Sequence, residues 1–287
     1  MRIFLPSGIG FCFGVINALQ LAKSELEKKE GPVYSLGELI HNPLVIEQLT
    51  KKGMKVISNL SSINKGTVIT RAHGIDPSLI EEGKKRGLRV IDATCPYVAK
   101  VQKIAKFLSQ QFYQIVMIGS ESHPEVKAVK ANVPNQKMYV LSNPAQVKNI
   151  PQSENIGVIV QTTELLDNFQ NIVKNLVKRK GEIRVFNTIC EVIRQRQIEV
   201  KNLAKKVQAM IIVGGHNSSN TYQLVKLCQS LKRKTYFVER KEDLNFDELK
   251  NFETIGIAGG TSTPREIIQD IKKILEDKFT KEGEKLN

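Results

Sequence analysis

Short apolar runs alternate along the chain with longer stretches in which apolar residues recur every three to four positions. The first pattern predicts buried strands and the second predicts amphipathic helices. One such unit has a strand at 31–36, a polar loop, a helix through Leu49 and a strand around 55–57. Strands and helices that alternate in this way predict parallel sheets and an α/β fold.

The alternation divides the chain into three similar blocks, and the first two each close on a cysteine. The third block lacks its last strand and its cysteine, and both are found at the start of the chain, where 2–5 runs into Cys12. The expected strands are 31–36, 55–57, 67–70 and 88–91 in the first block, 114–119, 137–141, 157–160 and 182–186 in the second, and 209–213, 234–238 and 254–258 in the third.

Internal repeats of this size predict three related domains. We expect them at 14–95, at 96–189, and at 1–13 together with 190–287, so that the third domain is completed by the N-terminal strand. A pseudo-three-fold arrangement would bring the three cysteines to a common centre.

Composition and charge narrow the class of protein. The chain has 41% hydrophobic and 25% charged residues, which is ordinary for a globular protein. No apolar run approaches the roughly 20 residues that span a bilayer. The first residues lack the pattern of a signal or transit peptide, so we expect a soluble, cytoplasmic protein without a membrane partner.

A net charge of +14 would suit nucleic acid, a phosphorylated ligand or an acidic protein partner. The aromatic content of 6%, with no Trp, argues against a surface on which bases stack. Nucleic acid is therefore not expected as a partner.

Four cysteines in a cytosolic chain favour metal binding or catalysis over disulfides. Cys12, Cys95 and Cys190 follow equivalent strands, whereas Cys228 lies in an apolar helical pattern and is expected in the core. Three thiolates suit a zinc ion with a fourth ligand, or an iron–sulfur cluster. A cluster with three cysteine ligands leaves one iron open to a substrate, which is typical of a catalytic centre.

Histidines and hydroxyl groups gather in the loops that follow the expected strands, where ligands bind in parallel sheets. The hydroxyl and amide residues stand where helices begin, so they either cap those helices or help to bind a phosphate or diphosphate. No Walker A or dinucleotide-binding glycine motif is present. His216 is expected to be an ordinary loop residue. The other members of this set are His41, His73, His123, Thr162, Ser218, Ser219, Asn220 and Ser262.

Glu125 is the one carboxylate within this set of loops, in His123-Pro124-Glu125. A carboxylate in a first helical turn stabilises the helix dipole. Beside an open iron and a hydroxyl such as that of Thr162, it would instead donate a proton.

Nine short motifs, in order along nearly the whole chain, resemble those of the 4-hydroxy-3-methylbut-2-enyl diphosphate reductase family. This family catalyses the last step of the methylerythritol phosphate route to isoprenoids. The motifs are Gly10-Phe11-Cys12-Phe13-Gly14-Val15, Ile40-His41-Asn42, Arg71-Ala72-His73-Gly74, Asp92-Ala93-Thr94-Cys95-Pro96, His123-Pro124-Glu125-Val126, Gln161-Thr162-Thr163, Asn187-Thr188-Ile189-Cys190, Asn217-Ser218-Ser219-Asn220, and Ala258-Gly259 through Ser262-Thr263-Pro264.

The resemblance implies a trefoil of three α/β domains around one 4Fe-4S cluster, and an iron–sulfur oxidoreductase. It implies that the fourth iron binds the substrate's allylic hydroxyl, and that two electrons and two protons convert it into isopentenyl and dimethylallyl diphosphates with loss of water. A ferredoxin or flavodoxin would donate the electrons. The implied residues are Cys12, Cys95 and Cys190 for the cluster, Glu125 as the proton source, and His41, His73, His123, Thr162, Ser218, Ser219, Asn220 and Ser262 for the substrate.

Two other hypotheses stay open on the sequence. An open-iron cluster also serves hydro-lyases, which consume no electrons, and three cysteines with one histidine also suit a structural zinc site in a basic, polyanion-binding protein. Asn17, Glu191-Val192-Ile193 and Ala128 to Ala131 depart from the family's usual pattern without removing a ligand or the acid.

Overall fold

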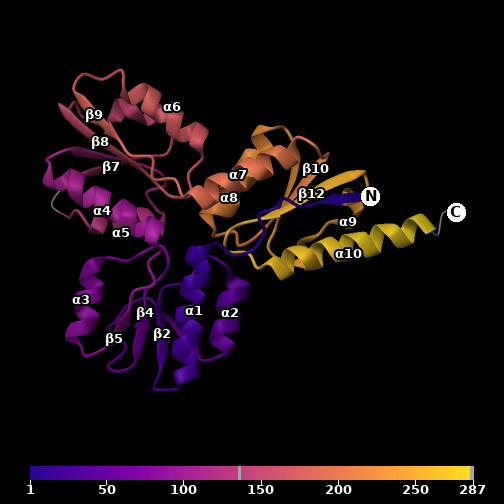
Figure 1. Ribbon diagram of the computed structural model, residues 1–287, viewed down its shortest axis with the longest axis horizontal. Coiled ribbons are helices and arrows are strands. Elements are labelled where there is room, and N and C mark those ends of the chain that lie inside the picture. Colours follow the sequence, from indigo (N-terminus) through magenta and orange to yellow (C-terminus); the bar gives the residue numbers. More distant parts are fainter. Residues whose placement is uncertain (135–136, 285–287) are drawn as a thin grey trace. The chain divides into compact units, whose positions relative to one another are not determined.

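The computed structural model describes residues 1–134 and 137–284 (Figure 1). Its strands form three four-stranded sheets in which every neighbouring pair is parallel. The predicted α/β class with three similar sheets is confirmed. Most of the expected strands also end within two residues of the observed ones.

The first sheet lies in the indigo to purple part of Figure 1 and has the strand order β3-β2-β4-β5. Val68 and Leu36 pack with Leu60 and Leu88 in its core. Asp76 caps α3 by accepting a hydrogen bond from the Ser78 N–H, and Pro77 starts that helix. The elements are α1 (Phe13–Lys28), β2 (Val33–Leu36), α2 (Pro43–Lys51), β3 (Met54–Ile57), β4 (Thr67–Ile69), α3 (Pro77–Lys85) and β5 (Arg89–Ile91).

The second sheet has the order β7-β6-β8-β9, and its two central strands are apolar on both faces. Successive residues of a strand point to opposite faces. Val116 and Ile118 therefore pack toward α6, and Ile115 and Met117 toward α4 and α5. The elements are α4 (Pro96–Gln110), β6 (Gln114–Ile118), α5 (Pro124–Ala131), β7 (Met138–Leu141), η1 (Pro144–Asn149), β8 (Asn155–Val160), α6 (Leu166–Leu176) and β9 (Glu182–Val185).

The third sheet joins the two ends of the chain, because β1 pairs with β12 in the order β1-β12-β10-β11. Figure 1 shows α7 and α8 on one side of β10 and β12, and α10 on the other. The elements are β1 (Arg2–Phe4), α7 (Glu191–Ala204), β10 (Ala209–Val213), α8 (Ser219–Ser230), β11 (Lys234–Val238), η2 (Lys241–Asp243), α9 (Phe246–Leu249), β12 (Thr254–Gly259) and α10 (Arg265–Glu284).

The chain packs as two compact units. Unit 1 consists of Met1–Cys12, His41–Pro43 and Glu191–Asn287 and holds the third sheet, whereas unit 2 consists of Phe13–Ile40 and Leu44–Cys190 and holds the other two. The boundaries expected between three domains stay a prediction. Within the described ranges, no helix is long and apolar enough to cross a membrane.

The apolar spacing predicts helices over 221–231 and 265–275, and the start of the first and the end of the second are wrong. Helix α8 begins at Ser219 and not at Thr221, because Ser218 already accepts the Thr221 N–H and takes the capping position. Helix α10 continues to Glu284 instead of ending at Leu275, since Ile271, Leu275 and Phe279 keep one apolar stripe against the core of unit 1.

Candidate active site

Glu125 and Thr162 form a buried, hydrogen-bonded pair in unit 2. Glu125 lies in the first turn of α5 and is 1% exposed, and Thr162 follows the end of β8. The Thr162 N–H donates to Oε1 of Glu125 at 2.8 Å, and the Thr162 hydroxyl pairs with Oε2 at 2.6 Å. Each oxygen of the carboxyl group therefore faces the same threonine.

Burial raises the pKa of Glu125 to about 7, while the two hydrogen bonds from Thr162 oppose that rise. Desolvation disfavours the charged form of a carboxyl group, and hydrogen bonds to the carboxylate favour it. The carboxyl group is thus half protonated near neutral pH. A carboxyl group of this kind can give a proton to a neighbouring hydroxyl.

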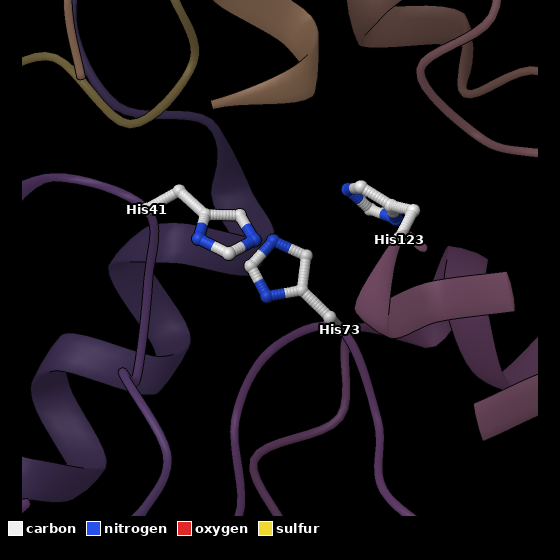
Figure 2. Close-up of side chains that lie close together, drawn as sticks. All are labelled: His41, His73 and His123. Atoms are coloured by element: carbon white, nitrogen blue, oxygen red, sulfur yellow. The ribbon is translucent and has the colours of Figure 1, made fainter. Parts of the chain in front are cut away.

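His123 stands directly before α5 and is ordered by that helix. Its Nδ1 accepts the N–H of Glu125 at 3.2 Å, so the proton of the neutral ring lies on Nε2. The rings of His73 and His123 meet edge to face, with centroids 5.6 Å apart and an interplanar angle of 85°. Figure 2 shows His73 on the loop after β4 and His123 at the start of α5; both belong to unit 2.

In unit 1, the segment that carries His41 is tied to the loop after β12. The Ser262 hydroxyl donates to the carbonyl of His41 at 2.9 Å, and the Asn42 amide donates back to the carbonyl of Ser262 at 2.8 Å. Two reciprocal bonds thus hold His41, the third histidine drawn in Figure 2, beside Ser262. Ser262 is itself 6% exposed.

Asn220 lies in the first turn of α8 and is 3% exposed. Among the described residues, neither its Oδ1 nor its Nδ2 has a hydrogen-bond partner. A buried amide left without partners costs about 1–3 kcal/mol. The side chain is therefore placed for a ligand that is polar and that reaches the start of α8, where backbone N–H groups favour an anion.

The hydroxyl residues expected at helix starts do not all cap a helix. Ser218 caps α8, whereas Leu165 stands at the start of α6 without a side-chain hydrogen bond, and Thr162 bonds Glu125 instead. Thr263 donates to the carbonyl of Val213 at 2.9 Å. Ser219 follows this cap as the first residue of α8.

The three candidate cluster cysteines share one backbone arrangement, which the sequence did not reveal. Each stands directly before a helix, at the positive end of its dipole, where negative charge is favoured. Each also donates its backbone N–H to a carbonyl in a loop that carries a candidate substrate-binding residue. The pairs are Cys95 with Ala72 (2.9 Å), Cys190 with Thr162 (3.0 Å) and Cys12 with Thr261 (3.1 Å).

Room for a group at Cys95 is provided by Gly14, the second residue of α1. A Cβ at Gly14 would lie 2.6 Å from Sγ and 3.2 Å from Cβ of Cys95. The bare glycine lets the thiol lie against the helix backbone. Soft thiol donors of this kind fit iron–sulfur clusters or zinc and suit neither calcium nor magnesium.

Replacing Gly14 by alanine is expected to reduce iron uptake at least twofold while the metal-free chain stays as stable as the wild type. Alanine is favoured over glycine in a helix by about 1 kcal/mol, so any loss comes from the displaced Cys95 thiol. Iron per chain after anaerobic reconstitution and the thermal unfolding of the metal-free chain measure the two effects. Unchanged iron uptake would contradict the placement of Cys95.

Cys228 and His216 are outside these groups. Cys228 is fully buried in α8, and burial raises its pKa to about 12, which confirms the expectation of an inert core residue. The His216 ring packs on Phe237 at 4.2 Å between centroids, and the backbone N–H of His216 donates to the Glu239 carboxylate. His216 is exposed on the surface of unit 1, as expected of a loop residue.

The sequence is similar to known proteins over nearly its whole length. The family described as "LytB protein" matches residues 3–276. The chain belongs to the LytB protein family. A relative from Geobacter sulfurreducens, called 4-hydroxy-3-methylbut-2-enyl diphosphate reductase, is 39% identical over 99% of this chain and 100% of its own length. A second, from Alkaliphilus oremlandii and of the same name, is 38% identical over 94% of this chain and 98% of its own length.

Solved structures of LytB relatives have the same fold. The E-1-hydroxy-2-methyl-but-2-enyl-4-diphosphate reductase of Plasmodium falciparum superposes with a TM-score of 0.91 at 29% identity, covering 96% of this chain and 87% of the other. A second structure, of (E)-4-hydroxy-3-methyl-but-2-enyl diphosphate reductase, has a TM-score of 0.70 at 36% identity and covers 96% of this chain and all of the other. That second enzyme is the terminal enzyme of the non-mevalonate pathway.

Proposed function

We propose that this LytB-family chain reduces 4-hydroxy-3-methylbut-2-enyl diphosphate to isopentenyl and dimethylallyl diphosphates, with loss of the allylic hydroxyl as water. The observation that carries the proposal is the buried Glu125 carboxyl group, with a pKa of about 7 and both oxygens on Thr162. Removal of a hydroxyl as water requires a proton at its oxygen, and this pair is built to deliver one. The names of the full-length relatives support the same reaction.

Cys12, Cys95 and Cys190 would hold one 4Fe-4S cluster. None of the three is in a disulfide, each lies at a helix N-terminus, and the bare Gly14 leaves room beside Sγ of Cys95. When bound, a cluster with three cysteine ligands supplies electrons one at a time and an open iron that acts as a Lewis acid toward the hydroxyl.

The residues proposed to bind the diphosphate offer hydrogen-bond donors within each unit. In unit 2, His123 offers an Nε2–H because its Nδ1 is already an acceptor, and His73 lies against its ring. In unit 1, the donors are those near the start of α8 and the loop after β12, where the helix dipole also favours an anion. The proposed unit 1 residues are His41, Ser218, Ser219, Asn220 and Ser262.

Thr162 would hold the substrate hydroxyl and pass it the proton of Glu125. The Thr162 hydroxyl is 2.6 Å from Oε2 of Glu125, so a proton can move from the carboxyl group to the threonine oxygen as that oxygen releases its own. The Thr162 N–H keeps the other carboxyl oxygen in place throughout. The 5% exposure of Thr162 limits competing bulk water.

An acidic ferredoxin or flavodoxin is the proposed electron donor, and the cytoplasm is the proposed compartment. A net charge of +14 would attract an acidic donor over a distance of about one Debye length, roughly 8–10 Å at physiological salt.

Replacing Asn220 by alanine is expected to lower kcat/KM for the allylic diphosphate about 10- to 100-fold, mainly through KM. The variant removes a buried amide that the unliganded chain leaves unsatisfied, so its thermal stability should equal or exceed that of the wild type. Asn171, exposed on α6, provides the matched control for an asparagine-to-alanine change. A destabilised Asn220→Ala with unchanged KM would show a purely structural role.

The proposed reaction is tested by an anaerobic visible spectrum with iron and sulfide analysis, followed by dithionite and a viologen mediator with and without the diphosphate. The reductase is expected to be brown, to hold about four irons per chain, and to oxidise reduced viologen only with substrate. Conversion of the substrate without viologen oxidation would indicate a hydro-lyase. A colourless protein with one zinc ion would indicate a structural zinc site.

A further inference from the structure

Arg196 lies in the middle of α7 and is 6% exposed, which is unusual for a charged side chain. Its Nη1 donates to the carbonyls of Gly10 at 2.9 Å, Gly260 at 3.0 Å and Gly259 at 3.2 Å. One guanidinium therefore joins the loop that leads to Cys12 with the end of β12. All four residues belong to unit 1.

These bonds lie next to the contact that fixes Cys12. The Cys12 N–H donates to the carbonyl of Thr261, one residue beyond Gly260, and Gly10 is two residues before Cys12. Glu199, one turn further along α7, holds the same loop through the Gly8 N–H at 2.6 Å. Two residues of one helix face therefore clasp the segment 8–12 at Gly8 and at Gly10.

The charge of Arg196 is incompletely balanced inside unit 1. Burial lowers the pKa of Arg196, while the charges of Cys12 and Glu199 raise it. In the described part of the chain, three carbonyl oxygens and no carboxylate lie within hydrogen-bond distance of this guanidinium. A buried cation is costly unless nearby negative charge compensates it.

We propose that Arg196 is a positioning residue that fixes the Cys12 loop and places a buried positive charge beside the Cys12 thiolate, so that it favours the reduced state of the cluster. The inference rests on the proposed function, since Cys12 is there a cluster ligand. Local charge is one of the factors that set the reduction potential of an iron–sulfur cluster. A fixed positive charge stabilises the state that carries one more electron.

Three variants separate charge from geometry. Arg196→Met removes both the charge and the carbonyl contacts, and Arg196→Lys keeps the charge on a side chain without the planar guanidinium. Arg194→Met is the matched control, because Arg194 lies on the same helix, carries the same charge, and is 44% exposed in an ion pair with Glu191. Each variant is made in the full chain.

The first readout is the midpoint potential of the reconstituted cluster, followed by visible absorbance during an anaerobic titration. In Arg196→Met, the ratio of reduced to oxidised cluster at the wild-type midpoint is expected to fall about tenfold, which is about 59 mV for one electron. Arg196→Lys should stay within about twofold of the wild type, and Arg194→Met should not change the ratio. An unchanged midpoint in Arg196→Met, or equal shifts in Arg196→Met and Arg196→Lys, would overturn the proposed role of the charge.

The second readout is amide hydrogen exchange of the segment around Cys12 in the metal-free full chain. Because Arg196 joins Gly10 to Gly259 and Gly260, the Cys12 N–H should exchange about tenfold faster in Arg196→Met, and faster in Arg196→Lys, than in Arg194→Met. Equal exchange in all three variants would overturn the proposed clasp, even if Arg196→Met takes up no iron. A wild-type chain that takes up no iron would instead refute the proposed function, and exchange would still report on the clasp.

Discussion

Replacing Glu125 by glutamine is expected to lower kcat with the allylic diphosphate by roughly 10²- to 10⁴-fold, the range that general acid catalysis contributes. Glutamine has the same shape and can keep both contacts with Thr162, but it has no acidic proton to give. Viologen oxidation under anaerobic conditions measures the loss. Glu121→Gln is the matched control, because Glu121 is exposed and paired with Lys130 on the surface.

The same group predicts the pH dependence of the enzyme. Glu125 must be protonated to donate, and its pKa is about 7, so kcat should fall as the pH rises through about 7. The Glu125→Gln variant should lose this step in its residual activity. A wild-type kcat that stays constant from pH 6 to 9 would contradict the role of Glu125.

Stability provides an independent check on the burial of Glu125. Its folded pKa of about 7 lies above its ordinary value of 4.5, so the folded state binds the proton more tightly than the unfolded state. The free energy of unfolding therefore falls as the pH rises from about 4.5 to about 7, and it stays lower above that pH. At pH 8, Glu125→Gln should raise the free energy of unfolding by up to about 3 kcal/mol, and the gain should vanish below about pH 4.5. Denaturant unfolding at the two pH values measures it. A Glu125→Gln variant less stable than the wild type at pH 8 would count against a strained, buried acid.

Replacing Cys95 by serine is expected to remove the visible absorbance of the cluster and to reduce turnover below detection. A serine hydroxyl is a poor substitute for a thiolate toward iron, and two remaining cysteines do not hold a cubane cluster. Iron and sulfide analysis with anaerobic viologen turnover measures both losses. Without a cluster, the proposed reduction has no source of electrons.

Cys228→Ala is the matched control for loss of a thiol. Cys228 is fully buried in α8 and its pKa is raised to about 12, so it is an inert core residue. This variant should keep its iron and its turnover, at some cost in stability from the smaller side chain. If Cys95→Ser retained the iron content of Cys228→Ala, the proposed ligand set would be wrong.

The sequence by itself determined the class of the fold and the order of its elements. Strand and helix patterns depend on local spacing of apolar residues, so β10 and β11 were predicted with their observed ends. The repeat predicts that the N-terminal residues supply the missing strand of the third block, and β1 does pair with β12. The motifs around the cysteines and histidines likewise indicated the family, because each is a short run of adjacent residues.

Local pattern was less reliable where two residues compete for one position. Ser218, Ser219 and Asn220 are all good capping residues, and spacing alone did not show that Ser218 takes the cap while the other two enter α8. The sequence predicts too early an end for α10, because the residues after Leu275 are mostly polar and hide the apolar stripe that continues to Phe279.

Tertiary structure alone decided which groups meet and how their chemistry changes. The raised pKa of Glu125 depends on its burial in the folded chain, and its partner Thr162 belongs to another strand-to-helix loop. Two other features also bring together segments that are distant in the sequence. Gly14 lies close to the Cys95 thiol, and Arg196 donates to the carbonyl of Gly10. Hydrophobic periodicity records which face of an element is buried, but it carries no information on which distant side chain is buried against it.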